Sequence, residues 1–475
     1  MEFREDSPRS LRARWGAAGG YRSLLAVAVP LILSNGASSV QQFIDRMFLA
    51  WSSPEAMAAA TPAGILNFTL MSLFINTAAY AGTFIAQYFG AGRQDRIGAV
   101  VWQTIYLSLA GAAVMAVISP FAGTIFRLIG HGPAIAPLEA AYFRILSLGA
   151  LFPILTAGLS GFYAGQGRTW PVLWINLQAT ALNVILDYWL IFGGLGVPAM
   201  GISGAAIATV AATASGTIVL ACMVFFRRDR KRFGIGRPRV EGDLLRRMVR
   251  YGVPSGLQVT MDVSGFTVFI LLIGRLGLQS LAATNIALSV NMLAFMPVIG
   301  LGIAVSILVG QHIGDHSIGL AEYSVYSGVH LALAYMVCIA AAYLFLPHLF
   351  LLPYTMNAAP GEYDSIAATT RVLLRFVALY SIFDALNLTF GSGIKGAGDT
   401  RFVVLANLVL SVGVLIIPAS LIILVFHGGM FGAWVVATAY VSFLGIVFYL
   451  RFRNGAWKKM RVIESPFETD AGLVP

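Results

Sequence analysis

Four acidic residues, Asp45, Asp187, Asp262 and Asp384, interrupt long apolar stretches of this chain. Holding a carboxylate at the centre of a membrane helix costs roughly 2.5–3.5 kcal/mol on insertion scales, so such residues are rarely kept without a function. In a water-accessible cavity a carboxylate binds and releases a proton, or holds a cation together with oxygens from asparagine side chains and backbone carbonyls. We therefore treat these four residues as candidates for binding Na⁺ or H⁺.

Each of these carboxylates lies on a polar stripe whose members are three or four residues apart, which places them on one face of a helix. These faces cannot point at lipid, because the bilayer core offers polar groups no partner. They either line a wet cavity or join helices by hydrogen bonds, and both readings stay open for the single Ser, Thr and Asn residues. The stripes are Asn35, Ser38, Gln42 and Asp45; Asn176, Thr180, Asn183 and Asp187; Ser255, Gln258 and Asp262; Tyr380, Asp384, Asn387 and Gly391; and a neutral stripe of Thr69, Ser72, Asn76 and Tyr80.

If the stripes line a cavity, that cavity is a candidate binding site for a small molecule. We expect its wall to contain polar residues of the stripes and two methionines, whose flexible thioether side chains suit apolar ligands as well as ordinary packing. The candidates are Asn35, Gln42, Asn76, Tyr80, Asn176, Thr180, Gln258, Met292, Met296, Tyr380 and Asn387.

The elements that position these residues are membrane helices. Hydrophobic residues make up 58% of the 475-residue chain and charged residues only 11%, whereas soluble domains contain roughly 25% charged residues. About 20 apolar residues cross the hydrocarbon core. The sequence predicts an all-α polytopic membrane protein with twelve transmembrane helices, at 24–50, 56–84, 97–119, 138–160, 170–194, 200–226, 249–274, 279–310, 323–346, 370–393, 402–426 and 430–452.

The two halves of the chain resemble each other. Short motifs recur at offsets of about 224–231 residues, for example Val29-Pro30 with Val253-Pro254 and Gly204-Ala205 with Gly432-Ala433. An even number of helices in each half predicts a parallel repeat with the binding site between the halves. We expect two pseudo-symmetric six-helix bundles, formed by residues 1–226 and 249–455, a basic cytoplasmic linker at 227–248 and a cytoplasmic tail at 456–475.

The formal net charge of +10 does not indicate nucleic-acid binding. Nearly all Lys and Arg residues lie in short loops or at the termini, which is the pattern that orients a membrane protein. The basic loop from Arg227 to Arg250 is expected on the cytoplasmic side, and twelve spans then place both basic termini there too. We read the first apolar run as a retained helix rather than a signal peptide.

Other chemistry finds little support in the sequence. Cys222 and Cys338 lie in apolar segments, so we expect neither a disulfide nor a metal site there. His312 and His316 have a helical metal-ligand spacing but fall at a glycine-containing helix end, which favours a solvated loop. There is no phosphate-binding loop of the G-x-x-x-x-G-K-[ST] type. We therefore expect no cofactor, no catalytic residues and no ATP-driven step, and we do not expect an enzyme.

The order and spacing of several motifs resemble the multidrug and toxic-compound extrusion (MATE) family, most of all its NorM-like bacterial branch. The resemblance covers about residues 20–455. The segments that carry it are Ile44-Asp45-Arg46-Met47-Phe48-Leu49-Ala50, Ala86-Gln87-Tyr88-Phe89-Gly90-Ala91-Gly92-Arg93, Gly165-Gln166-Gly167-Arg168-Thr169-Trp170-Pro171, Asn183-Val184-Ile185-Leu186-Asp187-Tyr188, Pro254 with Asp262, Tyr380-Ser381-Ile382-Phe383-Asp384 and Lys395-Gly396-Ala397-Gly398-Asp399-Thr400.

This resemblance implies a V-shaped pair of bundles that works by alternating access in a bacterial inner membrane. Asp45, Asn183 and Asp187 match the family's acidic cluster in the first half, and Asp384 matches a carboxylate of the second half. Asp262 stands where NorM-like members usually have Glu, which alters the reach of that charge. Arg46 replaces the small polar residue that is usual after the first Asp.

The leading hypothesis is a monomeric antiporter that exports bulky organic cations or drugs in exchange for Na⁺ or H⁺. One alternative is a flippase for lipid-linked sugars from the same superfamily, which would favour a more basic cavity than Arg46 and Arg144 provide. Another is the export of an endogenous metabolite. A membrane enzyme is a third class, for which the sequence shows no cluster of reactive residues.

Overall fold

We describe the protein from a computed structural model that covers residues 11–130, 132–194, 196–226, 230–236, 238–355 and 364–464. Regular structure in these residues is helical, apart from one isolated bridge between Gly194 and Val197. Eleven helices are long and apolar enough to cross a membrane, and the number is twelve if a pair bent by 41° forms one span. The predicted all-α polytopic fold is confirmed.

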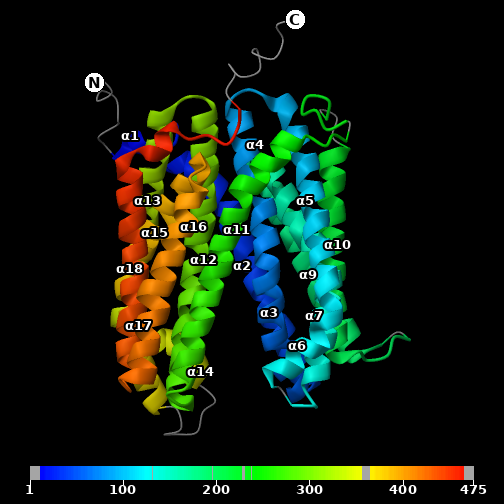
Figure 1. Ribbon diagram of the computed structural model, residues 1–475, viewed down its shortest axis with the longest axis vertical. Coiled ribbons are helices and arrows are strands. Elements are labelled where there is room, and N and C mark those ends of the chain that lie inside the picture. Colours follow the sequence, from blue (N-terminus) through cyan, green and yellow to red (C-terminus); the bar gives the residue numbers. More distant parts are fainter. Residues whose placement is uncertain are drawn as a thin grey trace, which may run out of the picture. The chain divides into compact units, whose positions relative to one another are not determined.

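The first part of the chain forms the following elements, most of which are labelled in Figure 1. They are α1 (Leu11–Gly16), α2 (Tyr21–Ser52), α3 (Pro54–Ala79), α4 (Ala81–Gly90), η1 (Gln94–Arg96), α5 (Ile97–Ile118), η2 (Ser119–Phe121), α6 (Ala122–Ile129), α7 (Ala136–Leu148), α8 (Leu151–Ala164), α9 (Trp170–Phe192) and α10 (Gly201–Phe225). The bent pair is α7 and α8, which together occupy the predicted span 138–160.

The second part of the chain is also helical. Its elements are α11 (Gly242–Gly274), α12 (Leu278–Gly314), α13 (Ile318–Phe345), α14 (Pro347–Thr355), α15 (Asp364–Ala397), α16 (Thr400–Leu410), η3 (Ser411–Ile416), α17 (Ile417–Ser420), η4 (Leu421–Val425), α18 (Met430–Asn454) and η5 (Ala456–Lys459). The stretches η3 and η4 are π-helical and flank Pro418. A proline inside a helix removes a backbone hydrogen bond, which favours such local widening.

The helices group into two compact units. Unit 1 contains residues 1–32, 261–309 and 317–460, and unit 2 contains residues 33–260, 310–316 and 461–475. These units do not correspond to a single division of the chain after residue 226. The helices α2 and α11, which are 32 and 33 residues long, each contribute one part to unit 1 and the other part to unit 2. The division into bundles of residues 1–226 and 249–455 stays a prediction.

Both units depend on small residues where helices approach closely. In unit 2, a Cβ on Gly161 of α8 would lie 2.8 Å from the backbone nitrogen of Gly82 in α4. In unit 1, a Cβ on Gly445 of α18 would lie 2.4 Å from the carbonyl oxygen of Phe383 in α15. Membrane helices gain little from burying apolar surface against each other, so such close backbone packing holds them together.

The regions expected as linker and tail are partly ordered. Residues 242–248 of the predicted linker already form the start of α11, while 227–229 and 237 lie outside the described residues. In the predicted tail, η5 follows α18 directly and Trp457 is fully buried. Residues 465–475 lie outside the described part of the chain.

Candidate coupling sites

Unit 2 contains an acidic cluster formed by α2 and α9. With its amide nitrogen turned toward the carboxyl groups, Asn183 donates to Asp45 Oδ1 at 2.8 Å and to Asp187 Oδ2 at 3.1 Å. One amide therefore brings two carboxyl groups together. Two carboxylates in one site repel each other, and a proton or a cation relieves this repulsion. The cluster is therefore a candidate site for a proton or a cation.

Burial raises the free-energy cost of this cluster when no proton or cation neutralises its charge. Asn183 and Asp187 are fully buried, and Oδ1 of Asp187 has no hydrogen-bond partner among the described residues. An acceptor without a partner loses its hydration with no compensation, which costs about 1–3 kcal/mol or more for a charged group. The position next to this oxygen is thus a favourable place for a cation or a proton.

The face of α2 that meets α9 differs from the predicted stripe. Thr180 donates to Gln41 Oε1 at 3.3 Å, and Asn176 donates to Ser34 Oγ. Gln42, a predicted cavity residue, is exposed instead. Gln41 precedes Asp45 by one helical turn, so helical periodicity could have identified Gln41 as a member of this face. The predicted stripe ran through Gln42, three residues before Asp45, and did not include Gln41.

Unit 1 contains a second acidic site, around Asp262 of α11. Asn407 of α16 donates to Asp262 Oδ1 at 2.8 Å, and the hydroxyl of Tyr440 in α18 lies 3.3 Å from the same oxygen. Tyr440 also donates to Asn407 Oδ1 at 3.1 Å, which closes a small ring of polar groups. Three helices therefore converge on one carboxylate.

Asp384 of α15 lies near this ring and interacts electrostatically with Asp262. Asn387, one turn further along α15, donates to Asp384 Oδ1 at 3.1 Å. Asp384 is 6% exposed and Tyr380 is 4% exposed, so both are nearly enclosed. Each unit thus contains two of the four predicted carboxylates, and in each unit asparagine donates to them.

Asn407 and Tyr440 were not among the predicted site residues. Asn407 follows Asn183 by 224 positions, an offset at which other motifs repeat between the halves. The internal repeat therefore pointed to Asn407 as the counterpart of Asn183. No comparable signal marked Tyr440, because a single tyrosine in an apolar helix usually belongs to the core.

A fifth membrane carboxylate, Glu139, was also overlooked. It lies in α7, within the predicted span 138–160, and is fully buried. One turn later, Tyr142 interacts electrostatically with both Asp45 and Asp187. Counting every acidic residue inside a predicted span would have found Glu139.

The predicted cavity residues are divided between the units. Asn76 donates to the carbonyl of Ser72 in its own helix at 2.9 Å, and Oε1 of Gln258 is buried without a partner among the described residues. Met292 is half exposed. In unit 2 lie Asn35, Gln42, Asn76, Tyr80, Asn176, Thr180 and Gln258, and in unit 1 lie Met292, Met296, Tyr380 and Asn387. Their role as a substrate cavity remains a prediction.

We expect Asn407→Leu to lower transport roughly tenfold, because Asp262 loses a hydrogen bond to a charged group, which is worth about 1.5–3 kcal/mol. Tyr440→Phe should cause a smaller loss. The matched control is Thr438→Val in α18, since among the described residues the Thr438 hydroxyl donates to the Trp434 carbonyl of its own helix, at 2.8 Å. Initial rates of substrate efflux from cells with equal amounts of each variant measure the effect, and a rate for Asn407→Leu equal to that of Thr438→Val would contradict it.

Comparisons with known proteins agree with this architecture. A family model described as MatE matches residues 30–189 and 254–447. A probable multidrug resistance protein NorM from Thermotoga maritima is 23% identical over 449 residues, which cover 93% of this chain and 94% of that protein.

Two solved structures superpose on the chain with a TM-score of 0.84 and cover 96% of it and 100% of their own chains. One, 18% identical, is described as the outward-facing conformation of a multidrug resistance MATE family transporter of the MOP superfamily. The other, 19% identical, is a MOP superfamily transporter from Pyrococcus furiosus, whose binding pocket is described as having a reverse polarity that suggests a different function. At these identities the likeness establishes the fold.

Proposed function

The chain belongs to the MatE family, and we propose that it is a multidrug efflux antiporter that exports bulky organic cations in exchange for Na⁺ or H⁺. Transport proceeds by alternating access, with the substrate bound by the polar stripes of the membrane helices. Both the antiport mode and the cationic substrate class rest on the chemistry of the buried carboxylates.

The observation that carries this proposal is the pair of acidic sites, Asp45 with Asp187 and Asp262 with Asp384. Each site is enclosed in membrane helices and each is supported by an asparagine that donates to a carboxylate. A proton, Na⁺ or an organic cation can neutralise such a site. If coupling ion and substrate compete for the same negative charge, binding of one releases the other, which is the requirement for exchange.

Energetics support counter-transport. Expelling a monovalent cation against the membrane potential costs roughly 2.3 kcal/mol per 100 mV. Entry of Na⁺ or H⁺ down its gradient offsets that cost. The acidic sites also argue against an anionic substrate. The two basic residues that were candidates for binding one, Arg46 and Arg144, are both exposed, and Arg144 lies 3.4 Å from the Pro120 carbonyl.

Transport in proteoliposomes tests the proposal. Purified protein is reconstituted with a fluorescent lipophilic cation, and an inward Na⁺ gradient or pH gradient is imposed in turn at zero membrane potential. We expect one of the two gradients to drive cation movement and its collapse by an ionophore to stop it. No cation movement under either gradient would reject the antiporter and favour the flippase, which is then assayed with a lipid-linked sugar in the same vesicles.

We further propose that the protein resides in the bacterial inner membrane as a monomer with both termini in the cytoplasm. The basic residues of the 227–250 loop and of both termini support this orientation. Reporter fusions at each terminus that are active only in the cytoplasm test it.

A further inference from the structure

After α18 the chain forms a tight turn, which leads into a short segment packed in unit 2. Gly455 adopts a left-handed conformation (φ 75°) that terminates the helix, and η5 then folds back. The indole of Trp457 stacks on Phe452 with ring centroids 4.8 Å apart, and its Nε1 donates to the Phe452 carbonyl at 2.9 Å. The turn is therefore a defined structure, and it directs the following residues, Arg461–Glu464, into unit 2.

These four residues, which we call the C-terminal strap, are packed into unit 2. The backbone nitrogen of Val462 donates to Gln87 Oε1 at 2.9 Å. Val462 and Ile463 are 1% and 7% exposed and belong to the same apolar core as Tyr88 and Leu244. The strap is thus an integral part of the unit, although it lies more than 200 residues from its partners in sequence.

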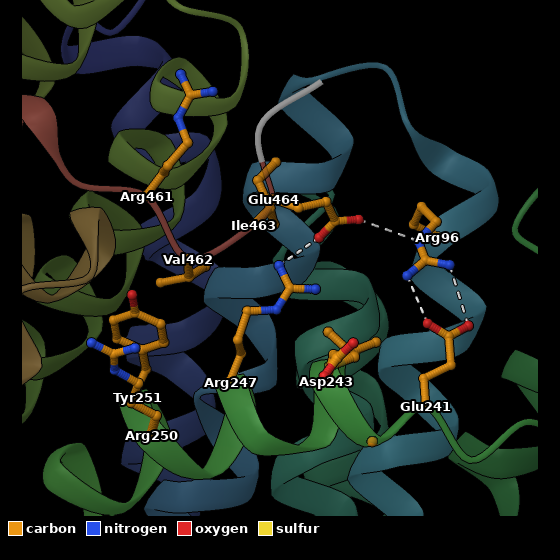
Figure 2. Close-up of a pocket in the computed structure, with 12 residues that line it drawn as sticks. Arg96, Glu241, Asp243, Arg247, Arg250, Tyr251, Arg461, Val462, Ile463 and Glu464 are labelled. Carbon is orange, nitrogen blue, oxygen red and sulfur yellow. Dashed lines mark hydrogen bonds and ion pairs between the residues drawn. The ribbon is translucent and has the colours of Figure 1, made fainter. Parts of the chain in front are cut away.

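Glu464 is the centre of a charge cluster at the end of the strap, shown in part in Figure 2. Its carboxylate lies 2.7 Å from Arg93, 3.6 Å from Arg96 and 2.5 Å from Arg247. The hydroxyl of Tyr88 donates to it at 2.7 Å. One carboxylate therefore joins the end of α4, the loop after it, η1 and the first turns of α11.

The charge of this carboxylate is permanent at physiological pH. Burial by itself would raise the pKa of Glu464, but hydrogen bonds from Tyr88 and Arg247 and the positive charge of Arg247 outweigh it and lower the pKa to about 2. The contribution to stability is complete above the ordinary pKa of a glutamate and is lost only as the pH falls toward 2. Protons do not release this contact under physiological conditions.

Removing Glu464 leaves three guanidinium groups that repel one another. Arg96 retains a second carboxylate, Glu241, at 2.6 Å, whereas the recorded ion pairs of Arg93 and Arg247 are with Glu464. The strap also forms one wall of a cavity of about 780 Å³, whose other walls include Arg247 and Arg250.

We propose that Glu464 closes a latch, which holds the end of the chain on unit 2 and restrains the movement of α18 during transport. Only Gly455–Met460 link α18 to the strap, and six residues reach at most about 20–22 Å when fully extended. While the latch is closed, the end of α18 cannot move beyond that reach from the arginine cluster. The restraint on transport presupposes the proposed alternating-access cycle, whereas the latch contact does not.

The contact is tested by hydrogen exchange of the full-length protein in lipid nanodiscs, followed in a peptide that contains Val462. We expect Glu464→Gln and Arg247→Gln each to accelerate exchange roughly tenfold or more, since each removes a charge-assisted hydrogen bond. The double variant should exchange little faster than either single one, because both changes break the same contact. Glu464→Asp, which keeps the charge, should retain part of the protection.

A matched control lies in the same segment. Lys458 forms a more exposed ion pair with Glu322 at 2.6 Å, and Lys458→Gln should leave exchange at Val462 unchanged. If Glu464→Gln leaves exchange unchanged, or if Lys458→Gln accelerates it equally, the latch is rejected. This measurement requires no transport, so it stands even if the wild-type protein moves no cation and the proposed function fails.

The restraint is tested in the same proteoliposomes as the proposed function. We expect Glu464→Gln to raise the maximal rate of cation exchange about threefold at equal protein content, with Lys458→Gln unchanged. A rate that stays the same or falls while Val462 exchanges faster would overturn the restraint and leave the strap as a purely structural contact. An inactive wild-type protein would instead reject the antiporter.

Discussion

Asp384→Asn is expected to lower export at least about tenfold while leaving the amount of protein unchanged. The substitution keeps the size of the side chain and one oxygen for Asn387, but it removes the negative charge at a 6% exposed position next to Asp262. Loss of an interaction with a charged group costs about 1.5–3 kcal/mol, which lowers transport roughly tenfold to more than a hundredfold. Drug resistance of cells and cation flux in proteoliposomes both measure this loss.

Two variants show whether the charge is the cause. Asp384→Glu retains a carboxylate and should keep part of the activity. Asp364→Asn makes the same chemical change at the exposed start of the same helix and should be close to wild type. Resistance of the Asp384→Asn cells at the wild-type level would exclude a role for this carboxylate in coupling.

Asp187→Asn should cause a loss of similar size for a different reason. Asp187 is fully buried and lies with Asp45 on the same Asn183 amide, so Asp187→Asn removes one of the two carboxyl groups of this site. Asn183 would then face one carboxyl group and one amide. Cation flux should fall roughly tenfold to a hundredfold under the gradient that drives the wild-type protein.

The control for this variant is Asp95→Asn, which alters an exposed carboxylate of unit 2 outside the cluster. Asp45→Asn should reproduce the loss, because both carboxylates belong to one site, and the double variant should be little worse than either single one. Additive losses in the double variant would show that Asp45 and Asp187 act independently. Comparison with Asp384→Asn then reveals which unit determines the response to Na⁺ or H⁺.

The membrane architecture follows from the sequence for a direct physical reason. A lipid solvent forces each crossing segment to be helical and apolar over about 20 residues, so hydropathy alone located the spans. All twelve predicted spans correspond to helices or helix pairs of the structure. The bend between α7 and α8 was not predicted, because it depends on how neighbouring helices pack. The π-helical stretches η3 and η4 were not predicted either, although Pro418 between them is visible in the sequence.

The acidic residues were also apparent from the sequence, because a carboxylate in an apolar stretch is costly wherever the helix is placed. Asp45, Asp187, Asp262 and Asp384 were identified on this ground. Glu139 was missed only because it lies near the start of its predicted span. The polar neighbours of these carboxylates were harder to predict. Gln42 was placed on the polar stripe, whereas Gln41 is the residue that accepts from Thr180.

Hydropathy, helical periodicity and the order of motifs were sufficient to predict the membrane helices, the carboxylates that they carry and the family. Which side chains meet could be read only from the packed helices: Asn407 and Tyr440 on Asp262, Gln41 beside Thr180, and Glu464 among three arginines. Helical periodicity is a local property and tells which residues share a face. The rotation of each helix toward its neighbours, and the path of the chain after α18, result from contacts between residues far apart in sequence.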